Sequence, residues 1–363
     1  MFNNSLFPKL RQNRQNTPLS LGEGLGVRSK LLAICLLLVC AVAHAQGPPI
    51  LHPGRIIFYN VENLFDTIND PITKDEEFLP QARNAWNTQK YKLKLKHLSH
   101  VLATMLDTIE PMVIGLAEIE NKKVLQDLIA QPELKKYSFG IIQHDSPDER
   151  GIDVAFLYNK DLIEVPLDAR LTVNLPGDKT RDIVYLKCYV NEGEPIWIFV
   201  NHWPSRWGGA AESDGNRLAA EKVLQAKIEN LYQGERFARV IVMGDFNDNP
   251  TDKSVSQLLT KKSFDPKEQD LQNLMLPIYK SGQYTLKYKS ENDVFDQFIV
   301  SKNLLNFKTP YFIRSGTAHI YNPEWLLFKH PKYGWVPNRT YASGKWVGGY
   351  SDHLPVYLDI VFK

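Results

Sequence analysis

The sequence has little cysteine, and this limits how the fold can be held together. Its 363 residues include three cysteines, two of which lie in an N-terminal segment that we expect to be removed. Cys188 then remains alone, and a single cysteine cannot form an internal disulfide. Because Cys188 lies inside an apolar, strand-like run, we expect it to be a small buried hydrophobic residue.

The sequence also lacks three common functional patterns and any sign of division into smaller units. It has no paired Cys/His motif for zinc, no glycine-rich phosphate loop and no Gly-x-Ser-x-Gly turn for a serine nucleophile. Residues 47–363 contain no Pro/Gly/Ser-rich linker, internal repeat or heptad pattern. These absences favour a single domain over 47–363 and a monomer.

The long hydrophobic run at residues 31–43 is too short for a comfortable transmembrane helix. Basic residues precede it, and the small-x-small pattern Ala43-His44-Ala45 follows it, as in a secretory signal peptide. We therefore predict an N-terminal extension and signal peptide over 1–46, cleaved near Ala45/Gln46. The mature protein is expected to be exported, periplasmic or extracellular, with no stable membrane span.

A large excess of positive charge is also missing. The whole chain has a formal net charge of +2, and residues 47–363 alone have 38 basic and 40 acidic residues, a formal −2. Proteins that hold nucleic acid mainly through a broad basic face are usually positive. A nucleic-acid partner would therefore have to bind through a local site.

Strand-like and helix-like patterns alternate along residues 47–363. In the segment 88–106, which reads as a helix, Lys90, Lys92, Lys94 and Lys96 form a basic stripe that we expect to face solvent. Residues 316–348 are rich in aromatic side chains and are expected to be a loop. Strands are predicted at 55–60, 112–117, 138–143, 152–158, 183–190, 195–200, 238–243, 294–300 and 356–362, and helices at 88–106, 122–130 and 212–232.

Polar side chains follow several of the apolar strands, where a rigid sheet can aim reactive groups into a cleft. Glu118 follows the strand at 112–117, and Asp245 and Asn247 follow the strand at 238–243. Cleaving a phosphate ester in water needs a divalent cation, a base that activates water, and donors that hold the phosphate. Glu118, assisted by Asn60, is the best candidate to bind Mg²⁺, which prefers few carboxylates.

Histidines end or precede two other strands. His202 ends the strand at 195–200 and can donate to a phosphate oxygen. His353 stands beside Asp352 in the loop that enters the last strand, and a basic histidine needs an orienting carboxylate. Asp296 is the natural partner, because a buried acid inside an apolar strand is costly without one.

The combined motifs resemble the endonuclease/exonuclease/phosphatase superfamily, which includes deoxyribonuclease-I-like and exonuclease-III-like enzymes. The resemblance spans about residues 55–361. It implies an α+β fold, a four-layer αββα sandwich of two packed, mostly antiparallel sheets flanked by helices, with the site at one edge. The matching motifs are Asn60-Val61-Glu62-Asn63, Leu116-Ala117-Glu118, Gly151-Ile152-Asp153-Val154, Asn201-His202-Trp203, Gly244-Asp245-Phe246-Asn247-Asp248 and Ser351-Asp352-His353-Leu354-Pro355.

The resemblance also implies roles for individual residues. The cation would be Mg²⁺, with Mn²⁺ or Ca²⁺ as alternatives, and either Asp245 or His353 would be the general base. The stretches 149–151 and 203–207 resemble an exported bacterial branch of the superfamily. By motif, Asn60, Glu118 and Asp352 would surround the metal, Asp245 and Asn247 would position water and phosphate, His202 would stabilise the phosphate, and His353 with Asp296 would form the acid–base pair.

Three functions remain open on the sequence. The first is an exported phosphodiester hydrolase, an endonuclease on DNA or RNA, with Arg150, Arg206, Arg217 and Asn201 near the substrate phosphates. The second keeps the chemistry but acts on a phosphate monoester or, like a sphingomyelinase, on a phospholipid headgroup. The aromatic segment at 325–346 does not separate these two functions, because it could stack on bases or lie at a membrane interface. The third is a non-catalytic binding module.

Overall fold

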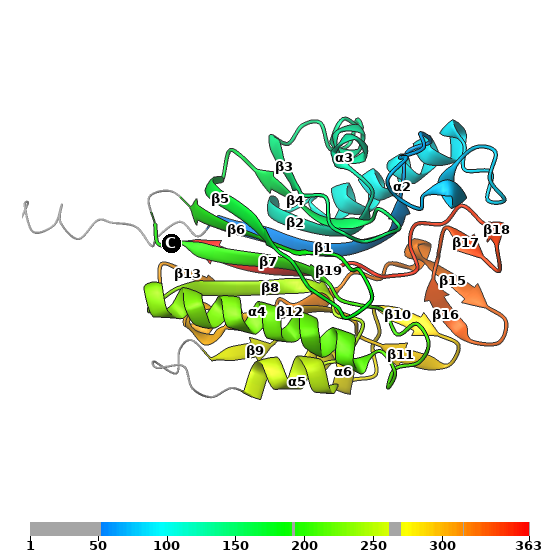
Figure 1. Ribbon diagram of the computed structural model, residues 1–363. Coiled ribbons are helices and arrows are strands. Elements are labelled where there is room, and N and C mark those ends of the chain that lie inside the picture. The colour runs from blue at the N-terminus through cyan, green and yellow to red at the C-terminus, as the bar shows by residue number, and fades with distance from the viewer. Residues whose placement is uncertain (1–51, 191–192, 261–269, 315, 363) are drawn as a thin grey trace, which may run out of the picture. The chain divides into compact units, whose positions relative to one another are not determined.

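The computed structural model describes residues 52–190, 193–260, 270–314 and 316–362, all within one compact unit, Leu51–Lys363. The predicted extension and signal peptide over 1–46 lie outside the described residues. Two β-sheets pack face to face, and helices cover their outer faces (Figure 1). The predicted α+β fold, a four-layer αββα sandwich, is confirmed.

The first sheet has seven strands among the described residues. In it β1 and β2 run parallel, and the remaining neighbours are antiparallel. Its strands are β1 (His52–Leu64), β2 (Glu110–Ile119), β3 (Phe139–Gln143), β4 (Asp153–Asn159), β13 (Tyr311–Ile313), β14 (His319–Ile320) and β19 (Val356–Phe362). Their order is β13-β19-β1-β2-β4-β3, with β14 also paired to β19.

The second sheet has six strands in the described part of the chain. In it β7 and β8 run parallel, and the other neighbours are antiparallel. Its strands, in the order β5-β6-β7-β8-β12-β9, are β5 (Ile163–Leu171), β6 (Ile183–Val190), β7 (Ile196–His202), β8 (Arg239–Asp245), β12 (Asp296–Ser301) and β9 (Leu271–Asn273). Each sheet thus has one parallel pair of strands. The carboxyl ends of both pairs lie at the same edge of the sandwich, where Asn60 of β1 contacts Asp245 of β8.

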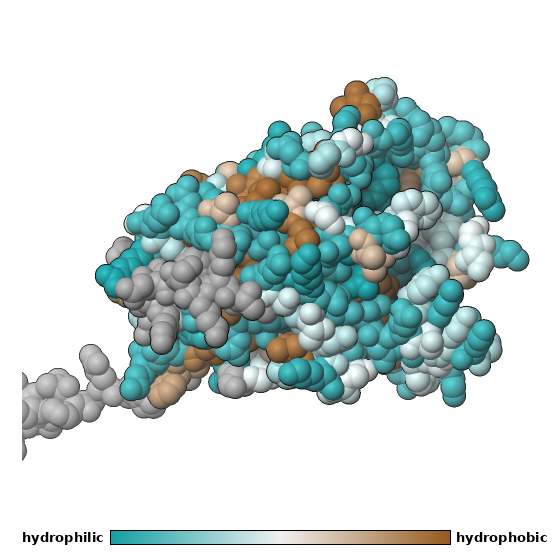
Figure 2. Space-filling view, turned by 60° about the horizontal axis from the view of Figure 1, so that its bottom comes forward, coloured by the Kyte–Doolittle hydropathy of each residue, from teal (hydrophilic) through white to brown (hydrophobic). Residues whose placement is uncertain are grey.

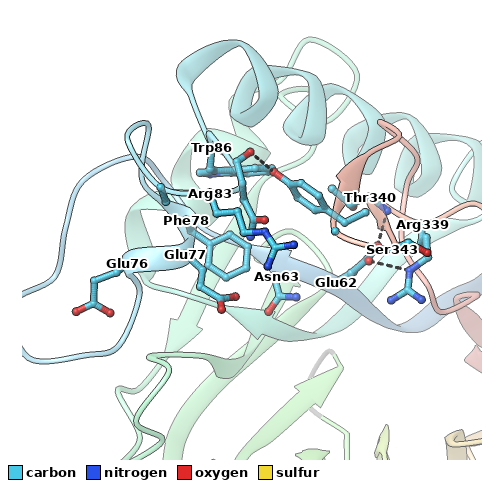
Figure 3. A pocket seen from close by; sticks show the side chains of 14 residues that line it. Glu62, Asn63, Glu76, Glu77, Phe78, Arg83, Trp86, Arg339, Thr340 and Ser343 are labelled. Atoms are coloured by element: carbon cyan, nitrogen blue, oxygen red, sulfur yellow. Dashed lines mark hydrogen bonds and ion pairs between the residues drawn. The ribbon is translucent and has the colours of Figure 1, made fainter.

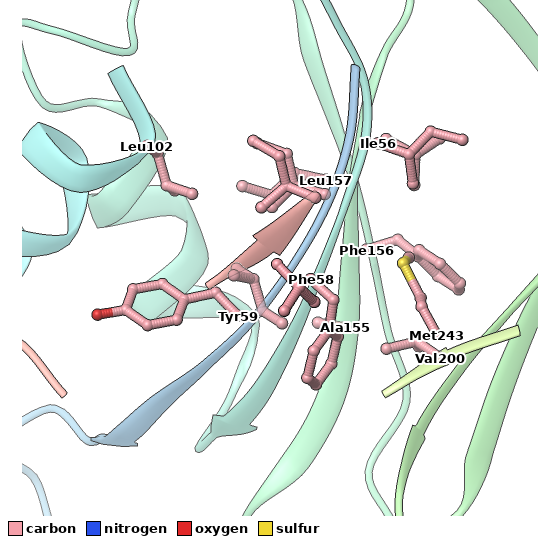
Figure 4. Packing of buried hydrophobic residues seen from close by; sticks show 14 of the residues in the cluster. Ile56, Phe58, Tyr59, Leu102, Ala155, Phe156, Leu157, Val200 and Met243 are labelled. Atoms are coloured by element: carbon pink, nitrogen blue, oxygen red, sulfur yellow. The ribbon is translucent and has the colours of Figure 1, made fainter. Parts of the chain in front are cut away.

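Alternation along the strands fills two hydrophobic layers. Val200 and Met243 point into the layer between the sheets, whereas Phe199 and Val242 point to the opposite face. Gly115 of β2 permits the close approach of the sheets, because a Cβ there would lie 2.5 Å from Met243 Cε. Figure 4 shows Met243 and Val200 among the side chains of the first sheet.

The helices cover the outer faces, as the sandwich requires. The helices α2 (Thr88–Met105) and α3 (Lys122–Ile129) pack on the first sheet, and α4 (Asp214–Gly234) and α5 (Lys253–Thr260) pack on the second (Figure 1). Asn87 and Asn121 cap the first two by accepting from backbone N–H groups of the first turn. A fifth helix, α6 (Leu276–Lys280), is short.

Apolar side chains gather in the interior rather than on the face seen in Figure 2, which is mainly hydrophilic with small, separate apolar patches. Cys188 is fully buried in the layer between the sheets, as predicted. Among the described residues, no helix is both long enough and apolar enough to cross a membrane.

The prediction that the lysine stripe of α2 faces solvent is wrong for Lys94. Its side chain is fully buried, and Nζ donates to Thr340 Oγ1 and Tyr350 O, both at 2.6 Å. The physical reason is helical periodicity: Lys94 lies three residues after Tyr91 and four before Leu98, on the face that packs inward. Burial lowers the Lys94 pKa to about 8, although the Glu62 carboxylate opposes this.

The prediction of a loop at residues 316–348 is also wrong. This region adds β14 to the first sheet and forms two hairpins beside the sandwich (Figure 1). Its strands are too short to show alternation in the sequence. The sequence analysis also missed β5, α5, β9 and α6. The remaining small elements are β10 (Leu286–Tyr288) with β11 (Glu291–Asp293), β15 (Leu327–His330) with β16 (Gly334–Pro337), β17 (Tyr341–Ala342) with β18 (Lys345–Trp346), and the 3-10 helices η1 (Glu76–Phe78), η3 (Lys302–Leu305) and η4 (Glu324–Leu326).

Candidate active site

The carboxyl ends of the two parallel strand pairs bring polar side chains from both sheets together. Asn60 of β1 lies across from Ala117, the residue before Glu118, and His202 lies across from Asp245. The Asn60 amide then joins the two sheets, because Nδ2 donates to Glu118 Oε1 (3.2 Å) and to Asp245 Oδ2 (3.0 Å). Asn60 is 1% exposed, so these contacts lie at the floor of the site.

Left-handed backbone at non-glycine residues is concentrated here. Glu62, Asn63, Glu118 and Asn247 have φ between +50° and +65°. Such conformations cost about 1–3 kcal/mol each and persist where surrounding contacts hold them. Asn63 N–H donates to Glu118 Oε2 (2.9 Å), and Asn247 Nδ2 donates to Trp203 O (2.9 Å). The strained backbone thus fixes the direction of the Glu118 carboxylate.

His353 and Asp296 form a buried pair. His353 Nδ1 lies 2.8 Å from Asp296 Oδ2, and its Nε2 lies 3.8 Å from Asp245 Oδ2. Burial lowers the His353 pKa, but the carboxylates of Asp296 and Asp245 outweigh it and raise that pKa well above its ordinary value. Because Nδ1 contacts the Asp296 carboxylate, we place a proton on Nδ1. Nε2 is the ring nitrogen that faces Asp245. Ser351 Oγ, which donates to Asn60 O (2.7 Å), accepts from His353 N–H (3.1 Å).

The pKa values of His202 and Asp245 are both shifted in the direction that favours the uncharged side chain. Burial, followed by the charges of Arg181 and Arg150, lowers the His202 pKa well below its usual range. Burial raises the Asp245 pKa to about 6, against the opposing charge of His353. His202 Nε2 lies 3.5 Å from Asp245 Oδ2. Near neutral pH the site therefore holds a neutral His202 and a protonated His353. Such opposite shifts in pKa let neighbouring groups take different roles in acid–base catalysis.

The candidate metal ligands come from three segments. Arg339 Nη2 donates to Asp352 Oδ2 (2.8 Å), and the charges of Asp352 and Glu118 both act on Arg339. Carboxylate oxygens of this kind suit Mg²⁺. Asn60 points its amide nitrogen, not its oxygen, at Glu118, so in this structure it holds the carboxylate in place. The donor set fits a divalent cation at Glu118 and Asp352.

A second arrangement of possible ligand atoms is tighter. One ligand atom each from Asp245, Asp296 and His353 lie within 4.8 Å of one another, and all three residues are buried. His353 Nδ1 is already engaged by Asp296, and the two carboxylates favour its protonated form, which cannot bind a metal. The geometry of this cluster therefore suits acid–base chemistry better than it suits the binding of a cation.

The arginines expected near the substrate are largely engaged within the protein. Arg206 donates to Asn247 O (2.8 Å) and Asp248 Oδ1 (3.0 Å), and Arg217 is buried with its Nε 2.8 Å from Asp248 Oδ2. Arg150 keeps an exposed side chain, with Nε 3.5 Å from Asp148 Oδ1. Of these three side chains, that of Arg150 is the most open to a ligand.

Asn201 lies in the interior and supports the site from behind. It is fully buried, its Nδ2 donates to Met243 O (3.1 Å), and its Oδ1 accepts from Trp203 Nε1 (3.1 Å). Gly244 packs directly against it, because a Cβ at Gly244 would lie 2.4 Å from Asn201 O. These contacts hold the turn that carries His202.

The sequence analysis missed three charged residues around the site. Arg181 is buried and donates to His202 O (3.2 Å) and Trp203 O (2.6 Å), so it fixes the loop after β7. Arg339 contacts Asp352 and Glu62, and Thr340 N–H donates to Glu62 Oε2 (2.6 Å). Of these three residues, only Glu62 could have been found from the sequence, because it belongs to the motif Asn60-Val61-Glu62-Asn63.

A family match over most of the chain makes this protein a hydrolase that acts on phosphoester bonds. The chain belongs to the Endonuclease/Exonuclease/phosphatase family, which it matches over residues 55–361. No curated protein matches the chain by sequence.

Solved structures share the fold at low identity. The human Nocturnin catalytic domain with bound sulfate has a TM-score of 0.52 at 18% identity, covering 86% of this chain and 95% of that one. D. rerio TDP2 complexed with a single-strand DNA product has a TM-score of 0.51 at 15% identity, covering 85% and 98%. The mannosyl-6-phosphatase Bt3783 of Bacteroides thetaiotaomicron has a TM-score of 0.51 at 14% identity, covering 85% and 100%.

Proposed function

We propose that this protein is a divalent-metal-dependent hydrolase that cleaves a phosphate ester by attack of water. The observation that carries the proposal is the buried His353–Asp296 pair facing Asp245, next to the Asn60–Glu118 contact. A cation bound at Glu118 and Asp352 would neutralise charge on the phosphate. The buried acid–base groups and the half-buried carboxylates of the candidate cation site therefore lie at the same edge of the sandwich.

Each residue has a distinct role in this proposal. Asp245, whose pKa is about 6, is ionised at neutral pH and accepts a proton from the attacking water. His353, held protonated by Asp296, donates to a phosphate or leaving-group oxygen. His202 is neutral and donates a hydrogen bond to the phosphate without adding charge. Asn247 holds the turn next to Asp245 through its N–H bond to Asp245 Oδ1 (2.9 Å).

A nucleic acid is one candidate substrate, cleaved internally as by an endonuclease. The motif set supports it, as does the solved structure of D. rerio TDP2 with a single-strand DNA product. Arg150, the exposed arginine near His202, would contact a substrate phosphate. In this version the enzyme is a phosphodiesterase that uses Mg²⁺, with Mn²⁺ or Ca²⁺ as alternatives.

A small phosphate ester is the second candidate, and one structural observation favours it. A pocket whose lining residues Asn63 and Arg339 contact Glu118 and Asp352 holds three glutamates and two arginines. It therefore has no excess of positive charge to hold a chain of further phosphates. The fold is shared with a mannosyl-6-phosphatase, and the family includes phosphatases. The chemistry at Asp245 and His353 is the same for both candidates.

The test uses protein that starts at residue 47, assayed with Mg²⁺, with Mn²⁺ and with a chelator. Supercoiled plasmid reports nuclease action, and bis-p-nitrophenyl phosphate and p-nitrophenyl phosphate report diester and monoester hydrolysis. We expect metal-dependent turnover by the wild type that is lost in His353→Ala and kept in His144→Ala. The control His144 pairs with Asp168 on the surface. Turnover unaffected by chelator, or an active His353→Ala variant, would overturn the proposal.

We also propose that the protein is exported, on the strength of the signal-like segment before residue 47. The full-length chain expressed in a Gram-negative host should yield periplasmic or secreted protein. Its N-terminal sequence should begin near Gln46. Recovery of uncleaved chain from the cytoplasm alone would contradict this.

A further inference from the structure

A pocket of about 610 Å³ adjoins the candidate metal ligands and has no part in the acid–base chemistry. Its walls come from three segments: residues 62–63 in the bulge of β1, residues 76–86, and residues 339–344 at the start of the β17–β18 hairpin (Figure 3). The volume lies in the range of small-molecule sites, roughly 300–1,000 Å³. The pocket is large enough for an organic group attached to the phosphate.

Two of its lining residues also contact the candidate metal ligands, and a third contacts Asn60. Asn63 N–H donates to Glu118 Oε2 (2.9 Å), and Arg339 donates to Asp352 Oδ2 (2.8 Å). Glu62 N–H donates to Asn60 Oδ1 (3.1 Å). The pocket and the candidate cation site are therefore joined by these contacts, so a group esterified to a phosphate at Glu118 and Asp352 would lie next to the pocket.

The charges of the pocket disfavour a second phosphate. Glu62, Glu76 and Glu77 line it with two arginines, Arg83 and Arg339. Arg339 pairs with Asp352 and Glu62, as the dashed lines of Figure 3 show for Glu62. Of the other charged lining residues, the two glutamates outnumber the one arginine. A nucleic-acid strand brings one negative charge per nucleotide and needs basic side chains to neutralise it. The pocket thus suits an uncharged group.

Its hydrogen-bonding groups call for a ligand that both donates and accepts. Carboxylates such as Glu77 only accept, and the guanidinium of Arg83 only donates. Hydroxyl groups do both, so a polyhydroxylated ligand satisfies both kinds of side chain. The half-buried ring of Phe78, stacked on Phe65 at 4.1 Å between centroids, adds an apolar wall. A sugar ring presents hydroxyls at its rim and C–H groups on its faces.

We propose that this pocket binds the sugar of a sugar phosphate monoester whose phosphate lies at the Glu118–Asp352 site. The inference rests on the proposed phosphoester hydrolysis and names its substrate class. Water attacks phosphorus, the bond from phosphorus to the sugar oxygen breaks, and that oxygen takes a proton. The products are the free sugar and inorganic phosphate. Glu77 and Arg83 act as specificity determinants.

The experiment compares kcat/KM for a hexose 6-phosphate, p-nitrophenyl phosphate and a single-stranded oligonucleotide, all with Mg²⁺. Variants Glu77→Gln and Arg83→Gln each remove one charged hydrogen-bonding partner from the pocket. The matched control is Glu324→Gln, an exposed glutamate on η4 that does not line the pocket. Loss of a hydrogen bond to a charged group should lower kcat/KM for the hexose phosphate about tenfold. The fall should be smaller for p-nitrophenyl phosphate, which has no hydroxyl groups on its ring, and Glu324→Gln should keep both values within about twofold of wild type.

The outcomes separate the two proposals. A wild type that hydrolyses p-nitrophenyl phosphate with metal but cleaves the oligonucleotide better than the hexose phosphate overturns the pocket assignment and keeps the hydrolase. Equal losses on both small substrates in the pocket variants also overturn it, because they indicate a structural effect. Absence of metal-dependent hydrolysis of every substrate contradicts the proposed function itself.

Discussion

The Nδ1 atom of His353 lies 2.8 Å from Oδ2 of Asp296, although the two residues come from different sheets. Asp296 is fully buried and His353 is 6% exposed. Asp296 begins β12, and His353 sits just before β19, so the contact exists only when the sandwich is assembled. The pair therefore links completion of the fold to completion of the acid–base site.

Asp296→Asn should lower kcat by about 10²–10⁴-fold, the range for loss of general acid–base catalysis. An amide in place of the carboxylate no longer holds His353 in its protonated form with the same orientation. The measurement is kcat for p-nitrophenyl phosphate, with the melting temperature as a check on folding. Asp168→Asn, which breaks the surface pair with His144, is the control and should be fully active. A folded Asp296→Asn protein with wild-type kcat would rule out this role.

Mg²⁺ or Mn²⁺ should raise the melting temperature of the wild type, because a ligand that binds only the native state stabilises it. Glu118→Gln and Asp352→Asn should remove most of this shift, since each deletes one carboxylate of the candidate site. Glu110→Gln, at the exposed start of the same strand β2, is the control and should keep the shift. An unchanged shift in both site variants would place the cation elsewhere, with the Asp245–Asp296–His353 cluster as the next candidate.

Much of the site could be predicted from sequence because its residues follow apolar strands. In each parallel pair the carboxyl ends of the two strands lie side by side. Glu118 therefore lies near Asn60 at the end of β1, and Asp245 lies near His202 at the end of β7. The partner of His353 was predictable for another reason. A carboxylate inside the apolar run 294–300 needs a partner to be buried at all.

Other contacts depend on packing that no local pattern encodes. Arg339 reaches Asp352 and Glu62 only because the hairpin region folds back over the end of β1. The sequence placed this region in a loop, so the pocket it completes could not be anticipated. Lys94 is different. The helical spacing places it on the inward face of α2, but its charge led to the prediction that it faces solvent.

Arg217→Met should reduce the free energy of unfolding by about 3 kcal/mol, the effect of leaving a buried carboxylate without one of its partners. Arg217 Nε lies 2.8 Å from Asp248 Oδ2, and its Nη1 donates to Ser213 Oγ (2.7 Å). Arg206→Met removes another partner of Asp248 but from a half-exposed side chain, and should cost less, about 1 kcal/mol. Urea denaturation at neutral pH measures both.

The same pair of variants distinguishes a structural arginine from one that binds substrate. If Arg217 acts only through Asp248, the folded fraction of Arg217→Met should keep its KM for p-nitrophenyl phosphate. A variant as stable as wild type with a raised KM would assign Arg217 to the substrate instead.

Asp153 should make the protein less stable as pH rises from about 4 to 7. Burial raises its pKa from 3.8 to about 6, although Ser146 N–H and Gln143 Nε2 both donate to it at 2.9 Å. Between those values the native state binds more protons than the unfolded state, so stability falls with increasing pH. The full shift corresponds to about 3 kcal/mol. Urea denaturation at several pH values should therefore show Asp153→Asn gaining about that much on wild type between pH 4 and 7. The control Asp107→Asn, at an exposed position, should run parallel to wild type. Parallel curves for Asp153→Asn would mean that the carboxyl is ionised in the native state at pH 4.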